Sequence, residues 1–111
     1  MAITDKDVVD SVAYEDDLLF LHMYDHLDFD GEFEKDHMLM LQDKLNTYIW
    51  YIDSKQYQAT YSSKNFKQFL IKIFFMFEPS GLCKKFIAHV NVRLSSSNIK
   101  LEYVVDKGNN D

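Results

Sequence analysis

The sequence predicts an α+β fold, a two-layer sandwich with two helices on one face of a mixed sheet. Two stretches space their apolar residues as helices do, and they alternate with stretches rich in β-branched and aromatic residues. Of the 111 residues, 47% are hydrophobic, enough for one core. The elements follow the order β-β-α-β-α-β, and right-handed strand–helix–strand units fit this architecture.

The first half of the chain predicts two strands and a helix. Residues 8–14 are rich in β-branched side chains, and the acidic residues 15–17 separate them from a second strand at 18–24, as in a hairpin. A helix then begins at Asp30 or Gly31, where acidic residues favour its positive N-terminal dipole. Its core stripe advances in steps of three and four residues. The stripe consists of Met38, Leu41, Leu45, Tyr48, Ile49 and Ile52.

The second half predicts a strand, a helix and a last strand. Residues 56–67 lack a clear period and predict a loop, with a short edge strand at 57–61. Residues 69–77 predict a strand near the sheet centre, covered on both sides. Ser80 then caps a helix that ends near Ser95. Its apolar positions are Leu82, Cys83, Phe86, Ile87, Val90 and Leu94.

The last predicted strand covers residues 99–105, which alternate between apolar and more polar side chains. The chain shows no internal repeat and no second set of elements. We therefore expect a single domain over residues 1–105 and a flexible C-terminal tail over residues 106–111.

Composition restricts the function classes. The longest apolar runs, residues 18–21 and 73–77, are far shorter than the roughly 20 residues that cross a bilayer. Cys83 is the single cysteine, and the N-terminus lacks the pattern of a secretory signal, which favours a cytoplasmic protein. Only Arg93 among the 12 basic residues is an arginine, which argues against nucleic acid as a partner. We expect neither a membrane nor a nucleic-acid partner.

Charge is distributed unevenly along the chain. Residues 1–43 hold 13 acidic and 2 basic side chains, a net charge of −11, whereas residues 44–111 carry +5. An acid excess of this kind keeps a protein soluble, and it also steers a cationic partner toward the acidic part. Both interpretations stay open at the level of the sequence.

The densest group of possible metal ligands lies between the second strand and the first helix. It consists of His22, Asp25, His26, Asp28, Asp30 and His37. Such imidazole and carboxylate groups bind zinc and similar ions. On an extended strand, however, His22 and His26 would lie about 13 Å apart at roughly 3.3 Å per residue. We expect a solvated acidic loop and no bound metal or other cofactor.

No catalytic motif can be written on this sequence. Its three glycines allow no phosphate-binding loop, dinucleotide fingerprint or nucleophile elbow. Cys83 lies near a predicted helix N-terminus, which can activate a thiol, but its neighbours Leu82, Phe86 and Ile87 are apolar. A buried, unreactive thiol is the expectation.

The back of the first helix carries an unusual set of side chains. At about 100° per residue, Leu39 and Trp50 fall on one side of this face and Met40 and Tyr51 on the other. Acidic residues, Asp36 and Asp43, lie between the two pairs. One possibility is that the loop at residues 57–66 covers this face. The other is that the face binds a protein, because tryptophan, tyrosine and methionine are common interface anchors.

Several segments resemble a family of small bacterial proteins of unknown function. That family has a D-H-L-D-W segment, a helix of the form L-Q-x-K-[IL]-N-x-Y and a strand that ends in E-P. Residues 25–29, 41–48 and 78–79 match these patterns. Phe29 replaces the tryptophan, and Lys55 stands where the family usually has a glycine after the helix. The resemblance implies a shared fold and no catalytic residues.

Together these features favour a non-enzymatic bacterial protein-binding protein, and specifically an immunity protein that neutralises a basic toxin domain. We expect a monomer or weak homodimer. The expected partner-binding residues are Asp28, Asp30, Asp36, Leu39, Met40, Asp43, Trp50 and Tyr51. One alternative is a homodimeric structural or regulatory protein that buries Phe20, Tyr24, Phe74 and Met76 against its twin. The other is a metal-dependent enzyme that uses residues 25–30.

Overall fold

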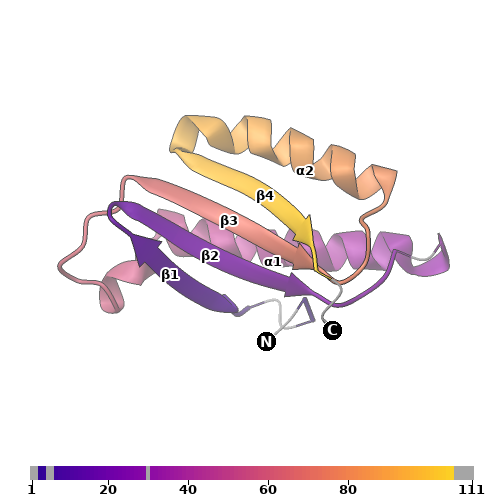
Figure 1. Cartoon of the computed structure of the whole chain (residues 1–111), viewed down its shortest axis with the longest axis horizontal. Helices are drawn as coiled ribbons and strands as arrows, with labels where there is room; N and C mark the ends of the chain where they lie inside the picture. Colours follow the sequence, from indigo (N-terminus) through magenta and orange to yellow (C-terminus); the bar gives the residue numbers. More distant parts are fainter. Residues whose placement is uncertain (1–2, 5–6, 30, 107–111) are drawn as a thin grey trace.

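The computed structural model, which describes residues 3–4, 7–29 and 31–106, contains a four-stranded mixed sheet with both α-helices on one face (Figure 1). The strands β1 (Ser11–Glu15), β2 (Leu18–Asp25), β3 (Gln68–Phe75) and β4 (Ile99–Val105) lie in this order across the sheet. β1 is antiparallel to β2, and the other neighbouring pairs are parallel. Helix α1 (Glu34–Asp53) follows β2, and α2 (Gly81–Leu94) follows β3. The predicted fold and element order are confirmed.

The core lies between the sheet and the two helices. Every second residue of the inner strands points toward the helices and is buried, as the period of a strand requires. Leu21 on β2 and Ile71 on β3 are paired in register and fully buried. Helix α1 contributes Leu41 and Leu45 to this core, and α2 contributes Ile87.

The first strand is shorter than predicted. It begins at Ser11, because the preceding residues turn toward α1, where the backbone carbonyl of Val8 and the side chain of Asp10 contact Lys44. A two-residue turn then joins β1 to β2, and Asp16 has a positive φ of 54° there. The predicted hairpin is thus present with a later start.

Helix α1 buries two polar residues that the predicted stripe omits. His37 and Lys44 are buried, whereas Met38 and Ile49 are only partly buried. A single turn of 3-10 helix, Gly31–Phe33, precedes α1, and no side chain caps its start. The stripe was predicted from apolar residues alone, and the buried polar residues shift the inward face toward His37 and Lys44.

The connection after α1 contains no strand. The predicted edge strand at residues 57–61 is wrong, because Gln56–Ala59 forms a short 3-10 helix instead. Lys55, at the start of this 3-10 helix, has a left-handed backbone conformation, with φ 60° and ψ 35°. Glycine adopts this conformation most easily, but here a lysine adopts it. Tyr57 and Phe66 then pack edge to face and close one end of the core.

Helix α2 matches its predicted bounds. The Ser80 side chain accepts a hydrogen bond from the backbone N–H of Cys83, the arrangement of an N-cap. Cys83 and Ile87 face the core, but Leu82 is 57% exposed. Leu82, one of the predicted apolar positions, does not face the core, because it lies one residue before Cys83 and therefore about 100° around the helix.

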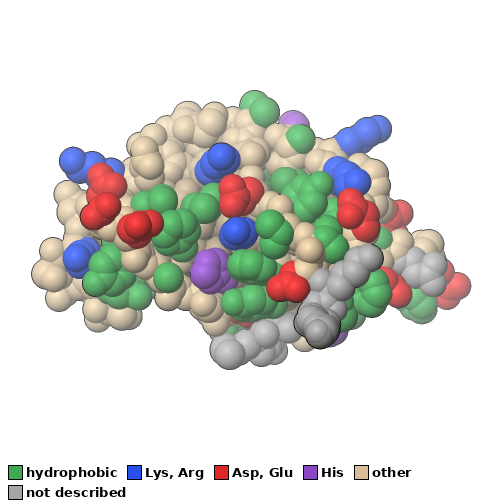
Figure 2. All heavy atoms as spheres, in the orientation of Figure 1, with side chains coloured by type: hydrophobic (Ala, Val, Ile, Leu, Met, Phe, Trp, Pro, Cys, Tyr) green, Lys and Arg blue, Asp and Glu red, His purple; other side chains and the backbone are tan. Residues whose placement is uncertain are grey.

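The outer face of the sheet is open among the described residues. Leu70, Lys72 and Phe74 on β3 alternate with the buried residues and are only partly buried, so β3 is central but not covered on both sides. β3 also ends at Phe75, which leaves Met76 and Phe77 exposed beyond it. Figure 2 shows hydrophobic side chains across this face, interrupted by charged ones.

Part of the predicted tail, residues 107–111, lies outside the described residues. Asp106 is described, and its backbone N–H donates to the carbonyl oxygen of Phe75. Within the described ranges, no helix has the length and apolar character needed to span a membrane.

Candidate functional site

Asp25 and His37 form a buried polar pair at the carboxyl end of β2. His37 Nε2 lies 2.6 Å from Asp25 Oδ2, and the two side chains are 2% and 0% exposed. The second ring nitrogen, Nδ1, lies 2.8 Å from the carbonyl oxygen of Asp28. The other carboxylate oxygen of Asp25 accepts the backbone N–H of Leu27. This Asp25–His37 clasp ties the loop after β2 to the first turns of α1.

The clasp favours the charged form of its histidine. Both ring nitrogens face oxygen acceptors, which a doubly protonated imidazole satisfies. Burial by itself would lower the pKa of His37, but the hydrogen bond and charge of Asp25, with the Asp28 carbonyl, raise it above its ordinary value. Phe29 stacks on the ring at 4.0 Å between centroids. With both nitrogens engaged, His37 has no free position for acid–base catalysis.

A second buried network joins the segment before β1 to α1. Lys44 Nζ donates to Asp10 Oδ1 at 2.8 Å and to the Val8 carbonyl at 2.9 Å, and the Lys44 and Asp10 side chains are fully buried. The second oxygen of Asp10 accepts the backbone N–H of Tyr24. Tyr48 accepts the Asp10 N–H and donates to the His22 carbonyl, and burial raises the Tyr48 pKa. This network holds structure together and presents no reactive group to solvent.

Cys83 is not an activated nucleophile. Its side chain is fully buried, and burial together with the negative charges of Asp25 and Glu34 raises the thiol pKa to about 12. A thiol with this pKa is almost entirely protonated at neutral pH. The structure therefore supports the expected unreactive thiol.

The candidate metal ligands do not converge in the described part of the chain. There, no three His, Cys, Asp or Glu side chains are grouped to hold an ion. His22 points to the outer sheet face, where Nδ1 lies 3.3 Å from Ser11 Oγ. His37 and Asp25 are occupied by each other, and His26 is exposed. The candidate ligand Asp30 lies outside the described residues.

The structure separates the two apolar pairs on the back of α1. Leu39 and Trp50 point outward and are 51% and 61% exposed. Met40 and Tyr51 are partly buried and pack against the core. Tyr51 also lies beside Tyr57, at 6.3 Å between ring centroids, so the loop after α1 covers Tyr51 but leaves Trp50 exposed.

The acidic residues of the predicted surface are spread over the length of α1. Asp36 and Asp43 are exposed on the same side as Leu39 and Trp50. Asp28 is exposed in the loop before α1 and lies at the opposite end of the helix from Trp50. We call Asp36, Leu39, Asp43 and Trp50 the outer stripe of α1. The structure does not place Asp30, which the prediction also included.

A groove of about 610 Å³ adjoins the outer stripe, and sequence reasoning missed it. Trp50 and Tyr51 line one wall, while Val9 and Val12 from the segment leading into β1 line the other. Among the described residues of its lining, Asp7 is the charged one. The groove joins residues nearly 40 positions apart, which no local pattern can reveal.

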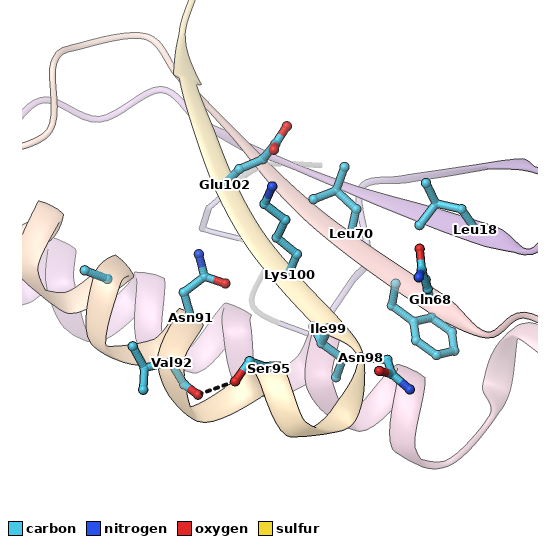
Figure 3. A pocket seen from close by; sticks show the side chains of 12 residues that line it. Leu18, Gln68, Leu70, Asn91, Val92, Ser95, Asn98, Ile99, Lys100 and Glu102 are labelled. Carbon is cyan, nitrogen blue, oxygen red and sulfur yellow. Dashed lines mark hydrogen bonds between the residues drawn. The ribbon is translucent and has the colours of Figure 1, made fainter.

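A larger hollow of about 870 Å³ lies where α2 passes the edge strand β4 (Figure 3). Its lining mixes apolar residues such as Val92 with polar ones, and its charged residues, Lys100 and Glu102, have opposite signs. No buried charged group lines it. Asn91 extends from α2 toward β4 in this region (Figure 3). We find no chemistry in this hollow that selects a ligand.

The fold and these sites define a small α+β protein with two buried polar networks and an exposed aromatic groove. The model of the family of unknown function DUF6572 matches residues 1–107, and the chain belongs to this family. The predicted membership in a family of unknown function is thus confirmed. Comparisons with curated proteins and with solved structures gave no match.

The residues that carry the family resemblance have structural tasks. Asp25 and Phe29 belong to the clasp around His37, and Lys44 and Tyr48 belong to the buried network with Asp10. These contacts give Asp25, Lys44 and Tyr48 a role in holding the fold together. The exposed Asp43 of the same helix segment has no such contact among those named here and belongs to the outer stripe.

Proposed function

We propose that this chain is a non-enzymatic protein-binding protein that docks a basic partner on the outer stripe of α1, with Trp50 as the anchor. The observation that carries the proposal is the 61% exposure of Trp50 at the margin of a groove. Tryptophan is over-represented among the residues that dominate binding energy at protein interfaces.

The groove gives Trp50 the surroundings that an anchor needs. Val12 and Tyr51 lie on its walls, so a partner side chain inserted beside Trp50 would be desolvated on several sides. Leu39 extends the apolar surface about 16 Å along the helix, at 1.5 Å per residue. A single exposed apolar residue needs no explanation, but an exposed tryptophan beside a groove fits an interface.

Charge supports a basic partner. Asp36, Asp43 and Asp53 are exposed on α1, against one exposed lysine of the same helix, Lys35. The other lysine of α1, Lys44, is buried against Asp10 and adds nothing to the surface charge. Acidic groups around an apolar anchor accelerate the association of a cationic protein.

Site-specific cross-linking tests the proposal. Leu39 is replaced by photo-reactive p-benzoylphenylalanine, and the full chain is irradiated in cells that naturally produce it. We expect a cross-linked product of discrete mass that contains a basic protein. The matched control carries the same group at Val92, which is 75% exposed on α2.

Identical products from both positions, or none from Leu39, would contradict docking on this face. If a product forms, the identified partner is purified and its affinity is measured against Trp50→Ala. An anchor predicts a loss of at least about 2 kcal/mol, whereas unchanged affinity would exclude Trp50 from the interface.

An immunity protein is the specific function that we favour within this class. Its support is the acid excess of the first part of the chain together with the exposed aromatic groove beside it. The test is growth rescue: cells that express the identified partner should stop growing, and co-expression of this chain should restore growth. A partner that is harmless to cells would exclude the immunity role while leaving protein binding intact.

The open sheet face favours one second candidate, a homodimer. Tyr24 and Phe74 stack there at 5.2 Å, and Lys72 and Glu102 lie 3.8 Å apart on the same face. A two-fold axis that placed each Lys72 near the Glu102 of the twin would give the self-complementary contacts that an isologous interface requires. Sedimentation equilibrium of wild type and Phe74→Lys decides this: a dimer that the variant dissociates supports it, and a monomeric wild type excludes it.

A further inference from the structure

The two edges of the sheet differ in how their backbone groups are protected. At the β4 edge, Asn91 of α2 donates from Nδ2 to the Leu101 carbonyl at 2.8 Å, and its Oδ1 accepts the Leu101 N–H at 3.1 Å. The amide side chain thus makes the two bonds that a neighbouring strand would make. Figure 3 shows Asn91 reaching from α2 toward β4. An incoming strand would have to displace it, so this edge is blocked.

The β1 edge has no such protection among the described residues. β1 is the outermost strand on the side opposite β4, and no described segment pairs with its outer edge (Figure 1). Its five residues include no lysine and no proline, the residues that commonly blunt an edge. The edge is therefore open to a further strand.

The register identifies the backbone groups that an added strand would meet. The two-residue turn closes on Glu15 and Leu18, a pair of the hydrogen-bonded type. Alternation along β1 then directs the N–H and C=O groups of Val12 and Tyr14 away from β2. Both side chains lie on the helix-covered side of the sheet, since they pair with the buried Leu21 and Leu19. Val12 also lines the groove beside Trp50.

From these contacts we propose that the β1 edge binds an extended segment of the partner by strand addition, with alternate side chains entering the groove next to Trp50. This inference rests on the proposed docking of a protein at α1 and specifies how it occurs. Backbone hydrogen bonds to Val12 and Tyr14 supply register, and the groove between β1 and α1 selects side chains.

Charge specifies the segment as basic. The exposed acids Asp7, Glu15, Asp16 and Asp17 flank the edge, and Asp7 is the charged residue of the groove. Among the described residues, Lys64 lies 4.6 Å from the Tyr14 ring centroid and the Lys67 backbone donates to the Asp17 carbonyl, so the four acids outnumber these two lysines. Two copies of this chain paired edge to edge would bring these acids together, and this repulsion disfavours a second copy as the occupant. A segment that alternates apolar with lysine or arginine residues fits both the groove and the charge.

The test uses peptides as the probe. The full chain is panned against a displayed library of random peptides of about twelve residues, long enough for a typical strand. The best binder is synthesised with each backbone nitrogen methylated in turn, and affinities are measured by fluorescence anisotropy. Strand addition predicts that methylation weakens binding about ten-fold at every second position and little at the positions between, the effect of losing one backbone hydrogen bond.

Chain variants locate the bound peptide. Val12→Pro removes an outward N–H and should weaken binding about ten-fold, while the control Ser11→Ala, whose backbone faces β2, should not. Circular dichroism checks the fold of each variant. If Val12→Pro does not fold, the methylated peptides still test strand addition, because they are measured on the wild-type chain. Trp50→Ala should weaken binding as well, because the alternate side chains lie beside it.

The outcomes separate the two proposals. If Trp50→Ala weakens peptide binding but methylation shows no alternating pattern, strand addition is overturned, while docking at α1 remains supported. Strand addition would also be overturned if the library yields no binding peptide, or if Trp50→Ala leaves the affinity of the best peptide unchanged. Docking at α1 is tested independently by the cross-linking experiment at Leu39. A dimer of the free chain that Val12→Pro dissociates would show that a second copy occupies the edge, which contradicts a basic partner strand.

Discussion

Single buried polar residues hold together parts of this molecule that are distant in sequence. Lys44 bridges from α1 to Asp10 and Val8 ahead of β1, and His37 bridges from α1 to Asp25 at the end of β2. Lysine is almost never fully buried unless it is paired, so its sequence position on α1 gave no reason to place it in the core. The partner of each residue lies on another element, and one sequence alone does not reveal such pairs.

Removal of Lys44 should be strongly destabilising. Lys44→Met leaves the carboxylate of Asp10 buried without its cation, which typically costs about 3 to 5 kcal/mol. Urea denaturation measures the loss of unfolding free energy. The double variant Asp10→Asn with Lys44→Met should lose less than the sum of the single changes, because no uncompensated charge remains. A loss below about 1 kcal/mol in Lys44→Met would mean that the pair contributes little.

Lys55 offers a stabilising substitution. Its left-handed backbone costs a residue with a side chain roughly 1 to 2 kcal/mol, and glycine avoids this cost while losing about 0.4 to 1 kcal/mol through greater freedom in the unfolded chain. Lys55→Gly should therefore raise the free energy of unfolding by about 0.5 kcal/mol. Lys55→Ala keeps a Cβ and serves as the matched control, which should bring no gain. Equal stability of both variants would show that the backbone conformation is not the cause.

Among the elements, periodicity predicted most of what the structure contains. The hairpin, both helices and the last two strands follow from spacing, caps and breakers in the sequence, and Ser80 caps α2 as expected. The errors fall where tertiary contacts override local preference. The aromatic residues at 57–61 suggest a strand, yet Tyr57 turns into the core against Phe66 and Phe69 and holds a 3-10 turn instead.

The Asp25–His37 clasp makes the joint between β2 and α1 sensitive to pH. The folded-state pKa of His37 is raised by Asp25 and Asp28, so the clasp stabilises the fold fully below the unfolded pKa of about 6.5 and loses this contribution as pH rises through the folded pKa. The free energy of unfolding of wild type should therefore decline as the pH rises above about 6.5, toward the raised pKa of His37. His37→Gln should flatten this decline.

His22 is the control for this titration because its shift has the opposite sign. Burial and the charge of Lys72 lower the pKa of His22, so its neutral form is favoured by folding. That contribution is present above the unfolded pKa and is lost as pH falls through the folded pKa. His22→Gln should alter the stability profile only below about pH 6.5. If the decline above that pH persists in His37→Gln, another group causes it.

For the whole molecule, the sequence predicted the architecture, whereas the structure divides the four apolar residues on the back of α1 into an exposed and a partly buried pair. Leu39 and Trp50 are exposed as the helical spacing indicated, but Met40 and Tyr51 are turned partly into the core because His37 and Lys44 widen the buried face toward them. The groove beside Trp50 requires β1 to lie next to α1, and sheet order was not readable from the sequence. Fold class follows from local patterns, whereas the site follows from how elements meet.

The proposed interface separates charge from contact, and the two should be distinguishable by kinetics. Exposed acids at the margin of an interface mainly raise the association rate, while a buried aromatic anchor mainly slows dissociation. Asp36→Asn with Asp43→Asn should therefore slow association with the identified basic partner and reduce its salt dependence. Trp50→Ala should accelerate dissociation with little change in association.

Surface plasmon resonance at two ionic strengths measures both rates for each variant. Asp28→Asn is the internal comparison, because Asp28 lies at the far end of α1 from Trp50 and should affect association less than the two helix acids. Circular dichroism must confirm the helix, since each acid near its start can stabilise it by about 0.3 to 1 kcal/mol. If the Asp36→Asn/Asp43→Asn variant and Trp50→Ala are both folded and both bind with wild-type rates, the partner docks on another face. The open side of the sheet is then the surface to mutate next.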